Sequence, residues 1–132
     1  MYVFDTFAIL AYFLAEPGGG KVKELLGGAE SGEISLAMSL INVGEVFYIL
    51  SRERGREKAQ SILADLRSLS IQFYNATEER ILVAARLKAD YPISYADAFA
   101  ASLAIELNAS LVTGDPEFKT IKEKLSLFWL DK

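Results

Sequence analysis

Short runs of β-forming apolar residues alternate with helical segments along the chain, and this alternation limits the possible folds more than any other feature. Strands are expected over 2–4, 33–36, 70–73, 110–113 and 125–130. Helices are expected over 7–14, 21–26, 39–50, 56–66, 77–89 and 95–107, and a further short helix opens at Pro116. Strands that alternate with helices favour a parallel sheet that helices cover on both faces.

Turn and cap residues separate these segments. Residues 16–20 read EPGGG, a strong break, and Gly27-Gly28 is expected to close the helix over 21–26. Ser94 is expected to cap an Ala-rich helix that stops at Asn108. The 132 residues suit one domain of roughly 100–150 residues. We therefore expect a single α/β domain over 1–132, with three α/β/α layers and a central, mostly parallel sheet of four to five strands.

The chain contains no Cys and no His. This excludes disulfides, thiolate nucleophiles, Cys/His zinc sites, Ser–His–acid triads and histidine acid–base catalysis. An enzyme of this composition must use Asp, Glu, Lys, Arg or Tyr, with or without a hard metal ion held by oxygen ligands. The net charge of −4 argues weakly against general attraction to a polyanion, although a bound cation can invert the local field.

The N-terminal residues 1–14, MYVFDTFAILAYFL, are apolar enough to resemble a signal peptide. However, Asp5 interrupts the run, no Lys or Arg precedes it, and it is shorter than the roughly 20 residues of a spanning helix. We expect a buried strand that continues into a helix, in a cytoplasmic protein with no membrane partner.

Two acidic residues follow expected strands. Asp5 comes directly after Tyr-Val-Phe, and Asp115 lies two residues after Leu-Val-Thr. Sites in parallel sheets lie at the carboxyl ends of the strands, so both acids are candidates for a site. Each also has a structural explanation, because Asp5 can cap the following helix and Asp115 precedes Pro116, a common first helical residue.

Two further acids lie in apolar helices. In the SYAD sequence at 94–97, Asp97 completes a capping box, and the small residues that follow permit close packing at the centre of the fold. Glu45 lies one helical turn from Ile41 and one from Ile49, a position that we expect to be buried. A buried carboxylate needs a compensating Lys or Arg, a hydrogen-bond network or a metal ion.

Together these acids fit one site. If Asp5, Glu45, Asp97 and Asp115 converge at one edge of a parallel sheet, their carboxylates repel one another and cannot all stay ionised unaided. A divalent cation such as Mg²⁺ or Mn²⁺ removes this conflict, because these ions prefer oxygen ligands.

The ordered acidic motifs resemble those of PIN-domain nucleases, and the chain length is similar to that of the VapC-type toxins of toxin–antitoxin pairs. The resemblance rests on Asp5-Thr6 after the first strand, Glu45 in an apolar helix, Ser94-Tyr95-Ala96-Asp97-Ala98 and Thr113-Gly114-Asp115. Each motif alone is common. Their order and spacing match over essentially the whole chain, and no acid is missing.

This resemblance implies a metal-dependent endoribonuclease that hydrolyses RNA phosphodiester bonds through a metal-activated water. It implies that Asp5, Glu45, Asp97 and Asp115 are catalytic ligands of Mg²⁺ or Mn²⁺, and one of them can also take a proton from the attacking water. Thr6 and Thr113 can orient these ligands through their hydroxyl groups, although both also fit ordinary helix-start and strand positions.

The resemblance also implies protein partners, namely a second copy in a homodimer and an antitoxin whose segment occupies the site. The apolar residues 43–50 and 12–14 can supply a contact surface or can simply be core. An RNA substrate needs positive charge to settle against. The first candidates are four cations around Gly55, with Lys21 and Lys23 as a weaker group: Arg52, Arg54, Arg56 and Lys58. The alternative for these four is a solvated corner between helices.

Other interpretations of the acids are possible. Haloacid-dehalogenase-type phosphatases need a second Asp two residues after the first, where this chain has Phe7. A phospho-acceptor receiver module needs an acceptor Asp at a middle strand end and a late Lys, and neither is evident. Two alternatives stay open: a PIN nuclease of RNA processing or quality control without an antitoxin, and a non-catalytic α/β assembly domain.

Overall fold

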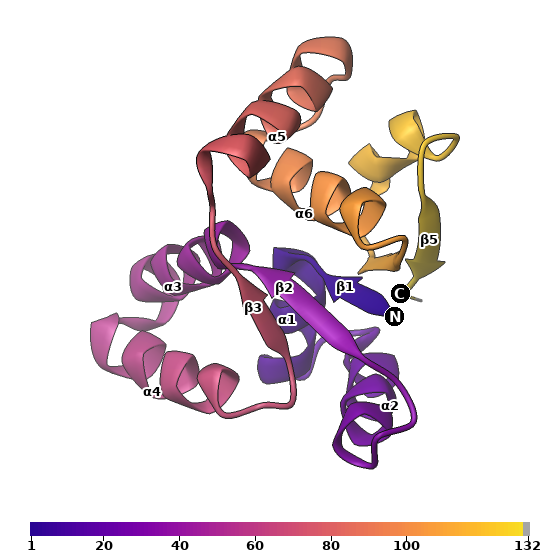
Figure 1. The fold of residues 1–132 in the computed structure, drawn as a ribbon. Helices are drawn as coiled ribbons and strands as arrows, with labels where there is room; N and C mark the ends of the chain where they lie inside the picture. The colour runs from indigo at the N-terminus through magenta and orange to yellow at the C-terminus, as the bar shows by residue number, and fades with distance from the viewer. Residues whose placement is uncertain (131–132) are drawn as a thin grey trace.

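A five-stranded parallel sheet forms the middle of the molecule in the computed structural model, which describes residues 1–130 (Figure 1). Its strands are β1 (Tyr2–Phe4), β2 (Leu36–Ser39), β3 (Gln72–Tyr74), β4 (Ser110–Thr113) and β5 (Ser126–Trp129). They lie in the order β3-β2-β1-β4-β5, and all four neighbouring pairs are parallel. The expected sheet of four to five mostly parallel strands is confirmed.

Helices cover both faces of the sheet, which confirms the three α/β/α layers. They are α1 (Thr6–Phe13), α2 (Gly19–Glu30), α3 (Leu40–Arg54), α4 (Arg56–Arg67), α5 (Glu78–Asp90), α6 (Tyr95–Glu106) and the 3₁₀ helix η1 (Pro116–Ile121). The first four helices share a core cluster with Phe4 and Val112, whereas α5, α6 and η1 share a second cluster with Val3 and Leu111. Successive strand residues point to opposite faces, so each strand contributes to both clusters.

The apolar N-terminal stretch forms β1 and α1, which pack into the core as expected. Ala8, Ile9 and Ala11 on α1 are fully buried, and Asp5 alone connects the strand to the helix. Within residues 1–130, no helix is long and apolar enough to cross a membrane.

The strand order reverses at β1. The chain passes from β1 to β2 and β3 on one side, and β4 and β5 are added on the other. Ligands of such sheets bind outside the carboxyl ends of the strands at the reversal. Here that position lies between the ends of β1 and β4, which Asp5 and Gly114-Asp115 follow.

The Ala-rich helix α6 is central to its layer, as expected. Every residue from Asp97 to Ala104 is buried, and the helix contacts α3, α5 and three strands. The Ser94 hydroxyl accepts a hydrogen bond from the backbone N–H of Asp97 (3.1 Å), so that the helix begins at Tyr95. Asn108, with φ at 52°, ends it.

Helix α2 is longer than expected, because the paired glycines lie within it rather than after the predicted segment 21–26. It ends before Gly32, whose φ of 86° favours glycine. The backbone N–H groups of Glu33 and Ile34 donate back to the helix (2.9 and 3.3 Å), so these residues close it and β2 begins only at Leu36. Strand β2 therefore lies three residues later than the expected 33–36, and, apart from α2 and the end of α3, the remaining elements lie within two residues of their expected bounds.

Candidate metal centre

An open cleft lies at the carboxyl ends of β1 and β4, where the strand order reverses. Its empty volume is about 650 Å³. The acids that the sequence points to all line it: Asp5, Glu45, Asp97 and Asp115. They come from the end of β1, from α3, from the first turn of α6 and from the start of η1. The structure therefore brings the four side chains into one cleft, while their role as metal ligands stays a prediction.

Asp5 is the most deeply buried of these acids, with 1% of its surface exposed. It caps α1 through Oδ1, which accepts a hydrogen bond from the backbone N–H of Ala8 (2.8 Å), and Oδ2 accepts one from the hydroxyl of Thr113. Burial raises the pKa of Asp5 from 3.8 to about 7. The two hydrogen bonds oppose this rise in pKa, and the charges of Asp115 and Glu45 add to it. The carboxylate of Asp5 can therefore cap α1 and belong to the acidic site at the same time.

Asp97, Asp115 and Glu117 form the tightest acidic group. One carboxylate oxygen of each lies within 4.8 Å of the others. Burial, followed by the charge of Asp115, raises the pKa of Asp97 well above its usual range. Glu117 and Asp5 raise this pKa further, and the hydrogen bond with Ser94 opposes the rise. Protonation of Asp97 is thus favoured by the same neighbours that make the group attractive to a cation.

Glu117 is a site residue that the sequence interpretation missed. Asp115 caps η1 through Oδ1, which accepts a hydrogen bond from the backbone N–H of Glu117 (2.9 Å). This cap places the two side chains in one tight turn beside the cleft. The Asp-Pro-Glu sequence contained the signal. A helix that begins at a strand end keeps its first turn at that edge of the sheet, so a second acid in this turn lies near the first.

Glu45 is only partly buried, contrary to the expectation of a buried carboxylate. Ile49 lines the cleft beside it, whereas Ile41 packs against the second core cluster, so this face of α3 passes from the core into the cleft. Glu45 accepts hydrogen bonds from the hydroxyl groups of Thr6 and Tyr48 (3.4 Å for Tyr48). A hydrogen-bond network therefore supplies part of the compensation that the sequence called for.

The two threonines lie where they can orient the acids. Thr113 is fully buried, and its hydroxyl donates to Asp5 and accepts a hydrogen bond from the backbone N–H of Asp115 (3.0 Å). Thr6 donates to Glu45 from the first turn of α1. Each hydroxyl thus contacts one of the acids proposed as ligands, which fits the expected orienting role.

Phe7 also lines the cleft, at the position where a phosphatase of the haloacid-dehalogenase type would need its second Asp. Its ring packs over Gly114, where an added Cβ would come within 2.3 Å of a ring carbon. The contact therefore requires glycine beside Asp115, and this side of the cleft carries an apolar ring instead of an acid–base group.

The donor set of the cleft fits a divalent cation. Within residues 1–130, no Lys or Arg forms an ion pair with any of its acids. The side chains available are carboxylates and hydroxyls, the oxygen ligands that Mg²⁺ and Mn²⁺ prefer. A bound cation would lower the pKa values of Asp5 and Asp97, which burial raises most and the neighbouring carboxylates raise further.

A family model of the PIN domain matches residues 2–124. The chain belongs to the PIN domain family. The resemblance of its acidic motifs to those of PIN domains is thereby confirmed, and no significant match is found among curated proteins.

Several solved structures are similar to this PIN domain over most of its length. One is a chain of VapBC2 from Rickettsia felis, in a crystal structure bound to a DNA fragment from the VapBC2 promoter. It is 26% identical, with 98% of each chain covered and a TM-score of 0.75. VapC20 from Mycobacterium tuberculosis, a Sarcin-Ricin loop cleaving toxin, is 16% identical, with 92% of this chain and 95% of that chain covered and a TM-score of 0.72. DNA-bound VapBC from Salmonella typhimurium is 15% identical, with 96% of each chain covered and a TM-score of 0.74.

Asn42 is a fully buried polar residue of this PIN domain to which the sequence interpretation assigned no role. Its Nδ2 donates to the hydroxyl of Thr6 and to the backbone carbonyl of Ala96, both at 3.2 Å. Asn42 thereby joins α3 to the start of α1 and to the turn of α6 that carries Asp97. An amide three residues before Glu45 in an otherwise apolar helix was the available signal.

Replacing Asn42 by Ala is expected to lower the free energy of unfolding by about 1–3 kcal/mol, because the carbonyl of Ala96 and the hydroxyl of Thr6 lose a buried donor. Urea denaturation measures the change. Asn75→Ala is the matched control, since Asn75 is exposed and only its backbone carbonyl accepts a hydrogen bond. Equal stability of the two variants would contradict the prediction.

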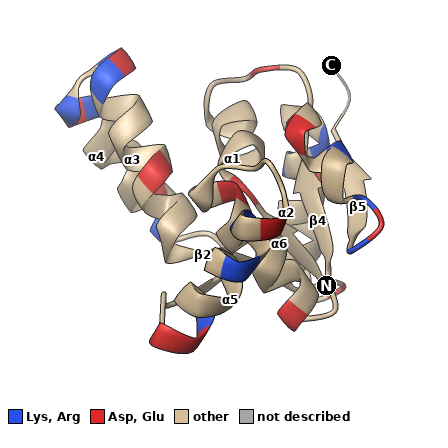
Figure 2. Cartoon of the chain, turned by 90° about the horizontal axis from the view of Figure 1, so that it is seen from above, with Lys and Arg blue, Asp and Glu red and all other residues tan. Residues whose placement is uncertain are grey.

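The four cations expected to bind RNA lie at the corner between α3 and α4 and do not line the cleft. They are all exposed: Arg52, Arg54, Arg56 and Lys58. Helix α3 continues past the expected Leu50 to Arg54, and Figure 2 shows Lys and Arg gathered at the tip that α3 and α4 form. The guanidinium of Arg52 lies 5.1 Å from the ring centre of Tyr48, whose hydroxyl contacts Glu45. Arg52 is therefore linked to the cleft through Tyr48.

Proposed function

We propose that this PIN domain is a metal-dependent endoribonuclease and the toxin of a VapBC-type toxin–antitoxin pair that acts in the cytoplasm. The observation that carries the proposal is the cleft itself, which Asp5, Glu45, Asp97 and Asp115 all line at the strand reversal and whose acids pair with no Lys or Arg among residues 1–130. Membership of the PIN family and the similarity to VapC and VapBC structures support the toxin assignment. The Sarcin-Ricin loop cleaving activity of VapC20 supports RNA as the substrate.

A bound Mg²⁺ or Mn²⁺ would supply a polarised water and would stabilise negative charge on the phosphodiester. The chain provides the ligands and their orientation. Asp5 and Asp115 offer carboxylates held by helix caps and, for Asp5, by Thr113, while Asp97 offers one from the first turn of α6 and Glu117 adds a fourth within reach. In the metal-free chain, burial and the neighbouring carboxylates raise the pKa of Asp97, so that a cation entering the cleft would displace a proton from this side chain.

We further propose a homodimer and an antitoxin segment that occupies the acidic cleft. The apolar residues 43–50 and 12–14 belong largely to the core or pack against it, although Tyr48 is 47% exposed. Residues 12–14 pack against the first core cluster, and Val43, Val46 and Leu50 are buried within it. The cleft itself therefore stays the proposed place for the antitoxin.

The chain is expected to cleave a labelled RNA in the presence of Mg²⁺ or Mn²⁺. Excess EDTA should stop this cleavage, and restoring the cation in excess should resume it. Calorimetric titration with Mn²⁺ should show binding, and Asp97→Asn should weaken it, because this change removes a charged ligand. Gel electrophoresis of the RNA gives the cleavage readout. Absence of Mn²⁺ binding would favour the non-catalytic assembly domain, and Mn²⁺ binding without cleavage of any RNA tested would retain the metal site and reject the nuclease.

The remaining alternative is a PIN nuclease of RNA processing or quality control that has no antitoxin. A small antitoxin-like reading frame beside the gene, whose product copurifies with this chain and blocks cleavage, is expected on the toxin proposal. If no such partner exists and expression does not slow growth, the processing role is favoured.

A further inference from the structure

The outward face of α5 carries three successive apolar residues that are exposed. Ile81, Leu82 and Val83 have 37%, 51% and 43% of their surfaces accessible to solvent. Three apolar side chains in a row are unfavourable on a water-facing helix unless they serve a contact. They mark a surface that is distinct from the acidic cleft, which none of them lines.

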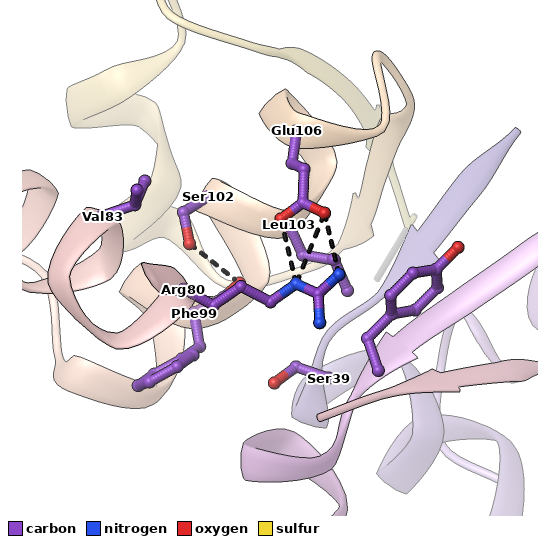
Figure 3. Close-up of a pocket in the computed structure, with 8 residues that line it drawn as sticks. Ser39, Arg80, Val83, Phe99, Ser102, Leu103 and Glu106 are labelled. Carbon is purple, nitrogen blue, oxygen red and sulfur yellow. Dashed lines mark hydrogen bonds and ion pairs between the residues drawn. The ribbon is translucent and has the colours of Figure 1, made fainter. Parts of the chain in front are cut away.

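The inner face of α5 is already occupied, so these residues do not belong to the core. Ala84 is buried against α6, and it lies nearly opposite Leu82 around the helix. Arg80 fixes this orientation, because its Nε and Nη2 donate to the carboxylate of Glu106 (3.1 and 3.0 Å) and its Nη1 donates to the carbonyl of Asn75 (3.1 Å). Figure 3 shows Arg80 reaching from α5 to Glu106 on α6.

Opposite charges lie at equal spacings on the two sides of Leu82. Glu78 precedes it by four residues and Arg86 follows it by four, so that the three side chains share one stripe of the helix. Both charged residues are exposed, and neither side chain has a hydrogen bond or ion pair with another of residues 1–130. The stripe is therefore complementary to an antiparallel copy of itself.

We propose that α5 forms an interface with a second copy of this chain, with the two α5 helices antiparallel about a two-fold axis at Leu82. A two-fold interface requires that residue i meets residue j and that j meets i. Pairing centred on Leu82 satisfies this, because Glu78 of each copy then faces Arg86 of the other and the two Leu82 side chains meet at the axis. The inference rests on the proposed homodimer and locates its contact.

A groove between α5 and α6 continues the surface. Val83, Leu87 and Tyr91 of the α5 side and Ile105 of α6 line it, and its empty volume is about 760 Å³. Ile105 is itself 46% exposed. Side chains that flank the axis on one copy can enter this groove on the other, which extends the apolar contact beyond the three residues on α5.

Charge reversal tests the pairing directly. Glu78→Arg alone and Arg86→Glu alone each place like charges opposite one another, and each is expected to raise the dimer dissociation constant at least 10-fold in analytical ultracentrifugation. The double variant Glu78→Arg/Arg86→Glu restores opposite charges and is expected to restore the dissociation constant to within about threefold of the unmodified chain. Rescue of this kind cannot arise from misfolding.

Leu82→Asp tests the axis, because it places two like charges there, and it is expected to yield monomers in the concentration range where the unmodified chain is dimeric. Lys23→Glu, an exposed charge reversal on α2, is the control and should leave association unchanged. Three results would overturn the proposal. The unmodified chain could prove monomeric, Leu82→Asp could leave the dimer intact, or the double variant could dimerise as weakly as the single variants. The proposal would also fail if Leu82→Asp abolished antitoxin binding but left the dimer intact, because this surface would then bind the antitoxin. RNA cleavage, measured in parallel, reports separately on the proposed nuclease.

Discussion

The free energy of unfolding of the metal-free protein is expected to fall by roughly 3 kcal/mol between pH 4 and pH 7 because of Asp5 alone. The pKa of Asp5 rises from 3.8 to about 7 in the folded state, chiefly through burial. Between these two values the unfolded chain has released the proton and the folded chain keeps it. The folded state therefore binds more protons, and its stability falls as the pH rises through this window.

Urea denaturation in EDTA at several pH values measures this dependence. Asp5→Asn is expected to flatten the profile, because the amide keeps the shape of the side chain and carries no charge. The combination of Asp5→Asn with Asp97→Asn should also raise the melting temperature at pH 7 above that of the unmodified protein, since the pKa of Asp97 is raised as well. Asp65→Asn, an exposed change on α4, serves as the control. A flat profile for the unmodified protein would reject the electrostatic account.

Replacing Asp5 by Ala is expected to lower the rate of RNA cleavage by on the order of 10³-fold, a loss typical of removing a group that stabilises transition-state charge. Asp5 lies deepest in the cleft and receives the Thr113 hydroxyl, so no neighbouring carboxylate can take its place. Single-turnover cleavage of a labelled RNA, with Mg²⁺ in excess, gives the rate.

A graded series distinguishes the role of Asp5 from a general effect on folding. Thr113→Val keeps the shape of a buried side chain but removes the hydroxyl that contacts Asp5, and a loss of about 10–100-fold is expected. Asp65→Asn should cleave at the unmodified rate. Cleavage that survives Asp5→Ala would point to a contaminating nuclease or to another site.

Most of the fold follows from patterns that are local in the sequence. The run Tyr-Val-Phe and the later Ser-Leu-Val-Thr alternate between the two core clusters, as buried parallel strands do. Once the strands are known to be parallel, their carboxyl ends share one edge, and the convergence of Asp5 with Asp115 follows. This step needs only the order of the elements and no knowledge of their packing.

The features that were missed depend on packing between distant segments. The paired glycines within α2 oppose a helix by propensity, yet burial of Val22 and Leu26 keeps the helix intact across them. Likewise, Glu117 enters the cleft only because η1 turns tightly at Asp115, and the role of Asn42 depends on Ala96 in another helix. The partial exposure of Glu45 arises because the face of α3 that carries it opens onto the cleft, which its isoleucine neighbours do not reveal.

The helix caps at Asp5 and Asp115 have a consequence for how such a sequence can diverge. The same carboxylates begin a helix and line the cleft, so under the proposed function selection for folding and selection for cleavage act on the same two side chains. Asn caps a helix about as well as Asp but brings no charge. A lineage released from cleavage should therefore replace these acids by Asn rather than by Ala, and its members should melt at higher temperatures in the absence of metal than their active ancestors.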